Sequence, residues 1–313
     1  MPGWTVAAIP DLTGTVAVVT GANSGLGYQT SLQLAAHGAH VVLASRDRTR
    51  GEQARVRLAG QAPRASTELL PLDLADLSSV RRFAAAYEQR HERCDLLVDN
   101  AGVMAVPRAR TADGFESQLG INHLGHFALT GLLLPRLLAS ADARVVTVSS
   151  LAHRQGVIHF DDLSAERGYT KWGRYGQAKL ANLLFAFELQ RRADAAGVRL
   201  RSVAAHPGLA ATELFANKTR AEGAAVKRRL GRLVERLFAQ SDAAGALPIL
   251  YAATMPDVVG GEYFGPDGPG EMRGHPRRVG TSPTARDPAL AARLWDESER
   301  LTGVRYTWSR LAA

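Results

Sequence analysis

The sequence predicts an α/β fold in which helices cover both faces of a doubly wound parallel sheet, giving three layers (αβα). Short apolar, β-branched runs alternate along the chain with longer segments of helical periodicity, which is the pattern of successive βαβ units. The junction between the first apolar run and the first helical segment, residues 20–27, is rich in glycine. A glycine turn at that position is typical of an open parallel sheet.

The elements are predicted in order from these patterns. The first run, residues 15–20, is continuously apolar or β-branched, as expected of a strand that is buried on both faces. Strands are predicted over residues 15–20, 40–44, 67–72, 96–98, 143–148 and 200–204. Helices are predicted over residues 25–37, 49–59, 77–90, 115–138 and 172–195, and Gly38 ends the first of them.

The C-terminal part of the chain departs from this alternation. Residues 218–238 form a basic amphipathic segment, and residues 260–288 are rich in Gly, Pro and Arg and predict an ordered loop or lid. A last helix is expected from Asp287, an N-cap followed by Pro288, to Thr302, with Gly303 as its stop. We therefore predict a single domain over residues 13–265 and an extension over 266–313 that packs near the substrate pocket.

The composition is that of an ordinary globular protein, with 313 residues, 46% hydrophobic and 22% charged. Cys94 stands alone, so an intrachain disulfide is impossible and a cytoplasmic location is expected. We expect no signal peptide and no membrane-spanning segment. The net charge of +8 comes mainly from arginine, and without a nucleic-acid-binding motif it indicates a solvated basic surface that attracts anionic ligands.

The glycine turn is a candidate pyrophosphate site. Its spacing is Gly-x3-Gly-x-Gly, and it follows a predicted strand and opens a predicted helix. Backbone N–H groups in such a turn can meet a pyrophosphate at the helix N-terminus, although a plain strand-to-helix turn is the alternative. The residues expected at the cofactor are Gly21, Asn23, Ser24, Gly25, Leu26 and Gly27.

The end of the second predicted strand distinguishes NAD from NADP. Ser45 and Arg46 stand where NAD-binding proteins place a carboxylate for the ribose hydroxyl. A guanidinium can bind a 2′-phosphate in bidentate fashion, so NADP(H) is the predicted cofactor. The alternative is that Arg46 is one more surface arginine. Asp47 lies one residue too late for the NAD role.

Two further strand ends are expected at the adenosine half of the cofactor. Asp73, followed by Leu74, is placed to accept a hydrogen bond from the adenine amine, and a strand-end cap is the alternative. Asn100, Ala101 and Gly102 follow the fourth predicted strand. Small residues at that point allow the backbone to approach the ribose closely.

Tyr175 and Lys179 are the predicted catalytic pair. Their spacing of four places both side chains on one helix face, one turn apart. The reduction of a carbonyl requires a proton, and a nearby ammonium favours phenolate and lowers the pKa of a phenol. Ser150, at the end of the fifth predicted strand, can hydrogen-bond the substrate oxygen, and Ser149 is the competing choice.

Asn122 lies inside an otherwise apolar helical run. A buried amide is costly without partners. The functional interpretation is a water-holding link in a proton relay to Lys179, and the alternative is an amide satisfied by the backbone. His123 and His126 could form a metal pair, but no carboxylate or cysteine set completes it, so no metal site is predicted.

Together these motifs resemble the short-chain dehydrogenase/reductase family over about residues 13–265, in order and in spacing. The resemblance rests on the glycine turn, the Asn100-Ala101-Gly102 triplet, Asn122, Ser150, Tyr175-x3-Lys179 and Pro207-Gly208-x3-Thr212. It implies a Rossmann fold, a catalytic tetrad of Asn122, Ser150, Tyr175 and Lys179, and cofactor contacts from Pro207, Gly208 and Thr212. Residues 148–153 and 176–182 are most similar to retinol dehydrogenases and protochlorophyllide-reductase-like members. Asp99 stands where the family usually has Asn.

The resemblance implies hydride transfer between NADP(H) and a carbonyl or alcohol of a largely apolar small molecule. Reduction of a C=C bond is the alternative within the same chemistry. A non-catalytic NADP-binding regulator is the alternative from another class, although such proteins generally lose the Tyr or the Lys. The resemblance also implies a possible homo-oligomer through the helices predicted over 115–138 and 172–195. The basic segment 218–238 is expected to form a lid, with contact to an anionic membrane surface as the alternative.

Overall fold

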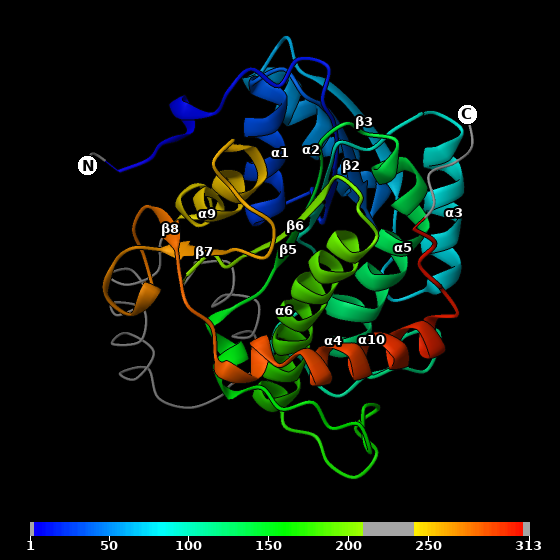
Figure 1. Cartoon of the computed structure of the whole chain (residues 1–313). Coiled ribbons are helices and arrows are strands. Elements are labelled where there is room, and N and C mark those ends of the chain that lie inside the picture. The colour runs from blue at the N-terminus through cyan, green and yellow to red at the C-terminus, as the bar shows by residue number, and fades with distance from the viewer. Residues whose placement is uncertain (1–2, 209–240, 309–313) are drawn as a thin grey trace, which may run out of the picture.

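The computed structural model describes residues 3–208 and 241–308 of the chain. Its centre is an eight-stranded sheet in the order β3-β2-β1-β4-β5-β6-β7-β8 (Figure 1). The strands are β1 (Val16–Thr20), β2 (His40–Ser45), β3 (Ser66–Pro71), β4 (Leu96–Asp99), β5 (Ala143–Val148), β6 (Leu200–Ala205), β7 (Tyr263–Pro266) and β8 (Pro276–Arg278). Neighbours from β3 to β7 are parallel, and β8 is antiparallel to β7.

Helices cover both faces of the sheet, as predicted. One face packs against α1 (Gly25–Ala36), α2 (Arg48–Gln61) and α9 (Asp242–Thr254). The other packs against α3 (Leu77–Glu88), α5 (Gly125–Leu138) and α6 (Lys171–Ala195), with α10 (Pro288–Thr302) outside α6. The shorter helical turns are α4 (Ser117–Leu119), η1 (Val6–Ala8), η2 (Gly120–Leu124), η3 (Leu151–Gln155), η4 (Pro269–Glu271) and η5 (Pro283–Arg286). The predicted three-layer fold class is confirmed.

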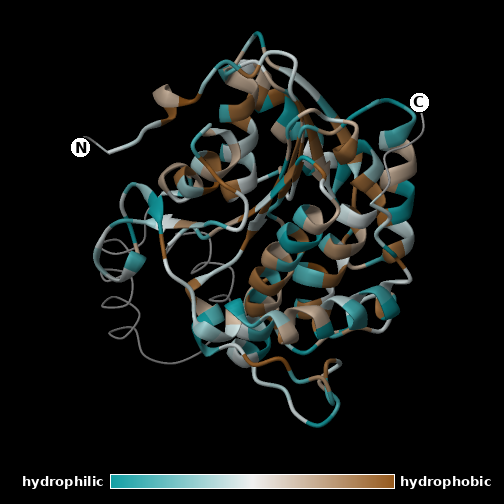
Figure 2. Ribbon diagram, viewed as in Figure 1, coloured by the Kyte–Doolittle hydropathy of each residue, from teal (hydrophilic) through white to brown (hydrophobic). Residues whose placement is uncertain are grey.

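Two apolar cores lie between these layers, one on each side of the sheet. Because the side chains of a strand alternate between faces, Val18 of β1 belongs to the core under α3 and α5, whereas Ala17 and Val19 belong to the core under α1 and α9. Figure 2 shows brown, apolar residues along the central strands and more teal residues on the outer helix surfaces. Within residues 3–208 and 241–308, no helix has both the length and the apolar composition needed to cross a bilayer.

Two predictions about elements need correction, and one helix was missed. The segment 260–288 is not a plain loop, because β7 and β8 pair within it and extend the sheet. The helix α9 was not predicted at all; Gly245 and Pro248 in its sequence obscure the helical signal. The helix predicted over 115–138 is interrupted by a π-helical turn at η2. The basic segment 218–238 lies outside the residues that the structure describes.

The last helix begins and ends where the sequence predicts. The Asp287 carboxylate accepts hydrogen bonds from the backbone N–H groups of Ala289 and Leu290, at 2.9 and 3.1 Å. Gly303 ends the helix in the left-handed conformation, with φ of 64°. These signals are local in the sequence and do not depend on tertiary contacts, which is why they predict the boundaries so well.

Candidate active site

A cavity lies at the carboxyl ends of β1, β2, β4 and β5. The strand order changes direction between β1 and β4, because β2 and β3 lie on one side of β1 and the later strands lie on the other side. This crevice is where open parallel sheets bind their ligands. The predicted site residues that line it are Gly21, Asn23, Ser24, Leu26, Gly27, Arg46, Asp73, Leu74, Asn100, Ala101, Gly102, Tyr175 and Lys179. The other predicted residues within the described chain lie outside its lining: Gly25, Ser45, Asn122, Ser150, Pro207 and Gly208. Thr212 lies outside the described residues.

Sequence reasoning missed a set of lining residues that mostly adjoin the predicted ones. They are Ala44, Asp47, Arg50, Leu72, Val103, Met104, Val106, Ile121 and Val148. Most of them lie at, or just beyond, the carboxyl end of a strand that the sequence already identifies. Their position at these strand ends could have predicted that they line the cavity. Val103, Met104 and Val106 directly continue the Asn100-Ala101-Gly102 triplet and give the cavity an apolar wall.

The glycine turn is packed too tightly for larger residues. Gly21 and Gly25 have φ of 67° and 57°, a region that favours glycine. A Cβ atom on Gly27 would lie 2.4 Å from the carbonyl oxygen of Gly21 and 2.5 Å from Asn100 Nδ2. The turn therefore brings α1 directly against the end of β4 and presents the helix N-terminus to the cavity, which is the cradle that a pyrophosphate requires.

A buried hydrogen-bond network joins this turn to the triplet after β4. The Thr20 hydroxyl oxygen accepts from the backbone N–H groups of Asn100 and Ala101, each at 2.9 Å. His126 Nδ1 donates to the carbonyl oxygen of Asn122 at 3.0 Å, so its Nε2 accepts from Thr20 Oγ1 at 2.9 Å. Burial lowers the pKa of His126 to about 4, which keeps the ring neutral. One imidazole thus links the glycine turn to Asn122.

His123, which the sequence analysis considered together with His126 as a possible metal pair, has a different hydrogen-bond partner. Its Nε2 lies 2.9 Å from Ser298 Oγ of α10. Burial lowers the pKa of His123 to about 3. The two imidazoles therefore contact different elements of the fold, His126 towards the cavity and His123 towards the C-terminal helix.

Arg46 lines the cavity directly after β2, at the strand end where the sequence predicts a 2′-phosphate contact. The neighbouring Asp47 is the N-cap of α2, and its carboxylate accepts from the backbone N–H of Arg50 at 3.0 Å. Its other oxygen lies 3.5 Å from Arg50 Nε. Arg50 thereby partly neutralises Asp47, and Arg46, Asp47 and Arg50 together leave this end of the cavity with a net positive charge. Ser45 is buried and its hydroxyl donates to the Asp47 carbonyl oxygen at 3.1 Å.

For Asp73 the structure shows the strand-end cap, and the contact with an adenine amine stays a prediction. It lines the cavity, and its Oδ1 also accepts from the backbone N–H of Ala75 at 3.0 Å, which is a strand-end cap. A carboxylate has further lone pairs, so this bond leaves it able to accept from an adenine amine.

Asn122 sits in the π-helical turn η2, a feature that is frequent at functional sites. Its side-chain amide is bonded on both sides to the backbone of Val103: Oδ1 accepts from N–H at 2.8 Å, and Nδ2 donates to the carbonyl at 2.9 Å. The side chain is therefore satisfied by backbone, and it fixes the segment that walls the cavity. A Cβ on Gly102 would lie 3.1 Å from Asn122 Oδ1 and 3.8 Å from Lys179 Nζ. The proton relay stays a prediction.

The two serines after β5 point to different partners. Ser149 Oγ donates to the carbonyl oxygen of Lys179 at 2.7 Å, which ties β5 to α6. Ser150 caps η3, where its Oγ accepts from the backbone N–H of Ala152 at 3.3 Å. Ser150 is 8% exposed and Ser149 is 1% exposed. Ser150 is therefore the better placed of the two to meet a ligand.

Tyr175 and Lys179 lie one turn apart on α6, and both line the cavity. Lys179 Nζ is 5.7 Å from the centre of the Tyr175 ring and donates to the carbonyl oxygen of Val148 at 3.0 Å. That carbonyl also accepts from Asn182 Nδ2 at 3.0 Å. The end of β5 thus holds the ammonium in place beside the phenol, at the point where β5 opens into the cavity.

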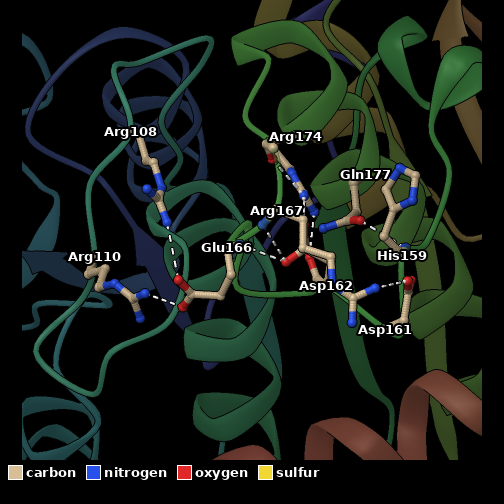
Figure 3. A network of polar contacts seen from close by, with 10 residues as sticks. Arg108, Arg110, His159, Asp161, Asp162, Glu166, Arg167, Arg174 and Gln177 are labelled. Atoms are coloured by element: carbon tan, nitrogen blue, oxygen red, sulfur yellow. Dashed lines mark hydrogen bonds and ion pairs between the residues drawn. The ribbon is translucent and has the colours of Figure 1, made fainter.

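The segment before Tyr175 is anchored by a polar network (Figure 3). Arg174 and Asp162 form a buried ion pair at 2.7 Å, and Arg174 also donates to the Gly168 carbonyl at 2.9 Å. Glu166 of the same loop pairs with Arg108 and Arg110, which follow the cavity wall in sequence. These contacts join the loop after β5 to the loop after β4, so the start of α6 and its Tyr175 are held from both sides.

The Pro207-Gly208 turn is held by a different pair. Gly208 has φ of 70°, and a Cβ there would lie 2.4 Å from the Met272 carbonyl oxygen. His206 Nδ1 accepts from the Gly208 backbone N–H at 3.2 Å, and its Nε2 donates to Glu271 at 3.1 Å. His206 thus caps the Gly208 backbone and joins this turn to Glu271.

Comparisons with known proteins agree with this geometry. The family model for short chain dehydrogenase matches residues 15–223. Retinol dehydrogenase 13 of Homo sapiens is 42% identical over 294 residues, covering 93% of this chain and 85% of that protein. Polyprenol dehydrogenase of Mus musculus is 43% identical over 302 residues, covering 95% of this chain and 86% of that protein.

A solved structure agrees as well. The crystal structure of a putative uncharacterized protein from Mycobacterium paratuberculosis has a TM-score of 0.79 and 45% identity. It covers 97% of this chain and 99% of that one. The likeness therefore extends through the C-terminal segment and is not limited to the dinucleotide-binding part.

Proposed function

The chain belongs to the short-chain dehydrogenase family, and from that premise we propose that it transfers hydride between NADP(H) and an alcohol or carbonyl group of a largely apolar substrate. The observation that carries the proposal is one cavity lined at one end by the glycine turn and Arg46, and at the other by Tyr175 and Lys179. The cofactor's binding groups and the proton donor thus open onto the same space.

The residues present fit a dinucleotide. The tight turn at Gly21 and Gly27 presents backbone N–H groups at the start of α1, and Arg46 offers a guanidinium to a 2′-phosphate. When bound, the nicotinamide would supply or accept the hydride. Gly102 leaves room between Asn122 and Lys179 for close approach of the ribose.

Within this proposal, Tyr175 transfers the proton that accompanies hydride transfer. The phenol donates its proton to the carbonyl oxygen during reduction and takes it back during oxidation. The Lys179 ammonium, held on the Val148 carbonyl, favours the phenolate that is left behind. Ser150 Oγ would hydrogen-bond the reacting oxygen and orient it.

The substrate class is proposed from the cavity wall and from two relatives. Val103, Met104, Val106 and Ile121 line the same cavity as the catalytic pair. Two relatives are named for retinol and polyprenol, which are both isoprenoid alcohols. We therefore favour a long, flexible isoprenoid-like alcohol or aldehyde, whose apolar chain such a wall would shield from water.

A binding and turnover experiment tests the proposal. The purified protein is titrated with NADPH and NADH, and cofactor oxidation is followed against apolar aldehydes, ketones and enones. We expect tighter binding of NADPH and turnover of an aldehyde or ketone to its alcohol. Conversion of an enone to the saturated ketone would instead support the C=C reductase.

The variant Tyr175→Phe separates catalysis from binding. It should bind NADPH as the wild type does and lose at least about a hundredfold in kcat, because the proton donor is gone while the fold is kept. Tyr251→Phe is the matched control, since its hydroxyl bonds Asp257 at the surface, and it should keep full activity. Equal turnover by Tyr175→Phe and wild type would disprove the assigned role.

A further inference from the structure

Polar side chains interrupt an apolar face of the sheet at the end opposite the cavity. On β2 and β3, Val42, Ala44 and Leu70 belong to the core under α3. His40 and Glu68 occupy the same face, two residues before Val42 and Leu70, because strand side chains alternate. His40 is the first residue of β2 and Glu68 is the third of the six residues of β3, so both lie in the amino-terminal halves of their strands, whereas the cavity lies at the carboxyl ends.

His91, which follows α3, completes a group of possible metal ligands with these residues. His40 Nε2 is 3.6 Å from Glu68 Oε1, and His91 Nε2 contacts the same oxygen. The three atoms all lie within 4.8 Å of one another. Ligands of a tetrahedral zinc ion lie about 2.0–2.2 Å from the metal, and hence roughly 3.3–3.6 Å apart. Small side-chain rotations would bring the group to that geometry.

The hydrogen bonding around His40 leaves its Nε2 available to bind a metal ion. Its Nδ1 lies 2.7 Å from Ser66 Oγ. A hydroxyl that accepts the Nδ1 proton leaves the lone pair on Nε2, as outer-shell partners of metal-bound histidines do. His40 Nε2 is buried and has no hydrogen-bond partner in the described structure. His91 is held in place by packing against the Tyr87 ring, with centroids 4.6 Å apart.

A plain ion-pair cluster is the competing interpretation. Arg90 Nε lies 3.9 Å from Glu68 Oε2 and already contributes positive charge. It faces the oxygen that the imidazoles do not use, so Oε1 stays directed at both histidines. A simple ion pair also leaves His40 Nε2 beyond hydrogen-bond distance of Glu68, whereas a shared cation satisfies both groups.

We propose that His40, Glu68 and His91 bind one divalent transition-metal ion of the Zn²⁺ class, through Nε2, Oε1 and Nε2, with solvent completing the coordination. Two imidazoles and a carboxylate form a donor set typical of zinc. The three side chains are 31%, 25% and 12% exposed, so the group lies near the protein surface. Its role is to join β2, β3 and the segment after α3, away from the cavity.

The test uses full-length, tag-free protein, because a polyhistidine tag would bind the probe. After treatment with a chelator, the protein is titrated with Zn²⁺ by calorimetry, and with Co²⁺ by visible absorption. We expect one equivalent of Zn²⁺, tetrahedral Co²⁺ bands, and a rise in Tm with Zn²⁺ that the chelator reverses. His40→Ala and Glu68→Gln should each weaken binding at least tenfold.

His159→Ala is the matched control, because His159 is exposed and lies in the loop before α6, remote in sequence from the proposed ligands. It should bind Zn²⁺ as the wild type does. If Glu68→Gln does not fold, His40→Ala still decides, since that residue is partly exposed at a strand end. No saturable binding, or equal affinity in His40→Ala, His159→Ala and wild type, overturns the proposal.

Discussion

At the scale of single residues, Asp99 is a carboxyl group in an apolar setting. It is 1% exposed, and Thr130 Oγ1 donates to its Oδ2 at 3.0 Å. Its Oδ1 is buried and has no hydrogen-bond partner in the described structure. Burial raises the pKa of Asp99 to about 8. In this buried site the neutral, protonated carboxyl group is more stable than the charged carboxylate.

This shift predicts a pH dependence of stability. The pKa of Asp99 in the folded chain lies above its unfolded value near 4, so folding takes up a proton between those values. Its contribution to stability is complete below about pH 4 and is lost as the pH rises through about 8. Asp99→Asn, which is neutral at every pH, should therefore exceed the wild type in free energy of unfolding by a margin that grows between pH 5 and 8.

Urea unfolding from pH 5 to pH 9 measures that margin. It should grow by at most about 1.4 kcal/mol per pH unit, the limit for one proton. Asp161→Asn is the control, because Asp161 is 72% exposed and pairs only at the surface with Arg167. It should show no such trend. A margin for Asp99→Asn that stays constant with pH would mean that Asp99 is ionised in the folded protein.

At the same scale, the proposed role of Arg46 in binding the 2′-phosphate of NADP(H) can be tested. Arg46→Ala should weaken NADPH binding about 10- to 100-fold, since hydrogen bonds to charged groups contribute about 1.5–3 kcal/mol. NADH binding should barely change, because NADH lacks the 2′-phosphate. Fluorescence titration measures both. Arg64→Ala, an exposed arginine beyond the other end of α2, should leave both affinities unchanged; a parallel loss of NADH binding in Arg46→Ala would contradict the assignment.

At the scale of elements, two helical glycines differ in how much space surrounds them. Gly27 in α1 has the Gly21 carbonyl oxygen 2.4 Å from where its Cβ would be, whereas Gly60 in α2 has no heavy atom within 4 Å of that point. Gly27→Ala should therefore displace the turn and weaken NADPH binding at least tenfold. Gly60→Ala should raise the free energy of unfolding by about 0.5–1 kcal/mol, because alanine favours helix.

Thermal unfolding and NADPH titration of both variants check this pair. The two substitutions are chemically identical, so the contrast depends on the close approach of α1 to the glycine turn. Gly60→Ala should bind NADPH as the wild type does. Normal NADPH affinity in Gly27→Ala would show that the turn is looser than its packing indicates.

At the scale of the whole molecule, the C-terminal segment is part of the core. Trp295 of α10 is 2% exposed, and its ring lies 5.1 Å from that of Phe127 in α5 and 5.9 Å from that of Phe185 in α6. Tyr306, beyond the helix, lies 4.4 Å from Trp295 and donates to the Phe127 carbonyl oxygen at 2.7 Å. The segment thus joins α5 to α6, the helix that carries Tyr175 and Lys179.

Trp295→Ala should lower the free energy of unfolding by about 3–5 kcal/mol, the usual cost of deleting a buried aromatic side chain. Trp172→Ala is the matched control, because that ring is 61% exposed, and its effect should stay within about 0.5 kcal/mol. Denaturant unfolding measures both. Equal stability of the two variants would mean that α10 is only peripheral to the core.

The sequence by itself determined the fold class, the glycine turn, the position of Tyr175 one helical turn from Lys179, and both ends of α10. Those features depend on periodicity, turn chemistry and caps, which act between residues a few positions apart. Tertiary structure alone decided the pairing of β7 with β8, the π-helical turn at Asn122 and the His126 bond to Thr20. It also brought His40, Glu68 and His91 together. These contacts join segments distant in sequence, and their partners depend on how the chain packs.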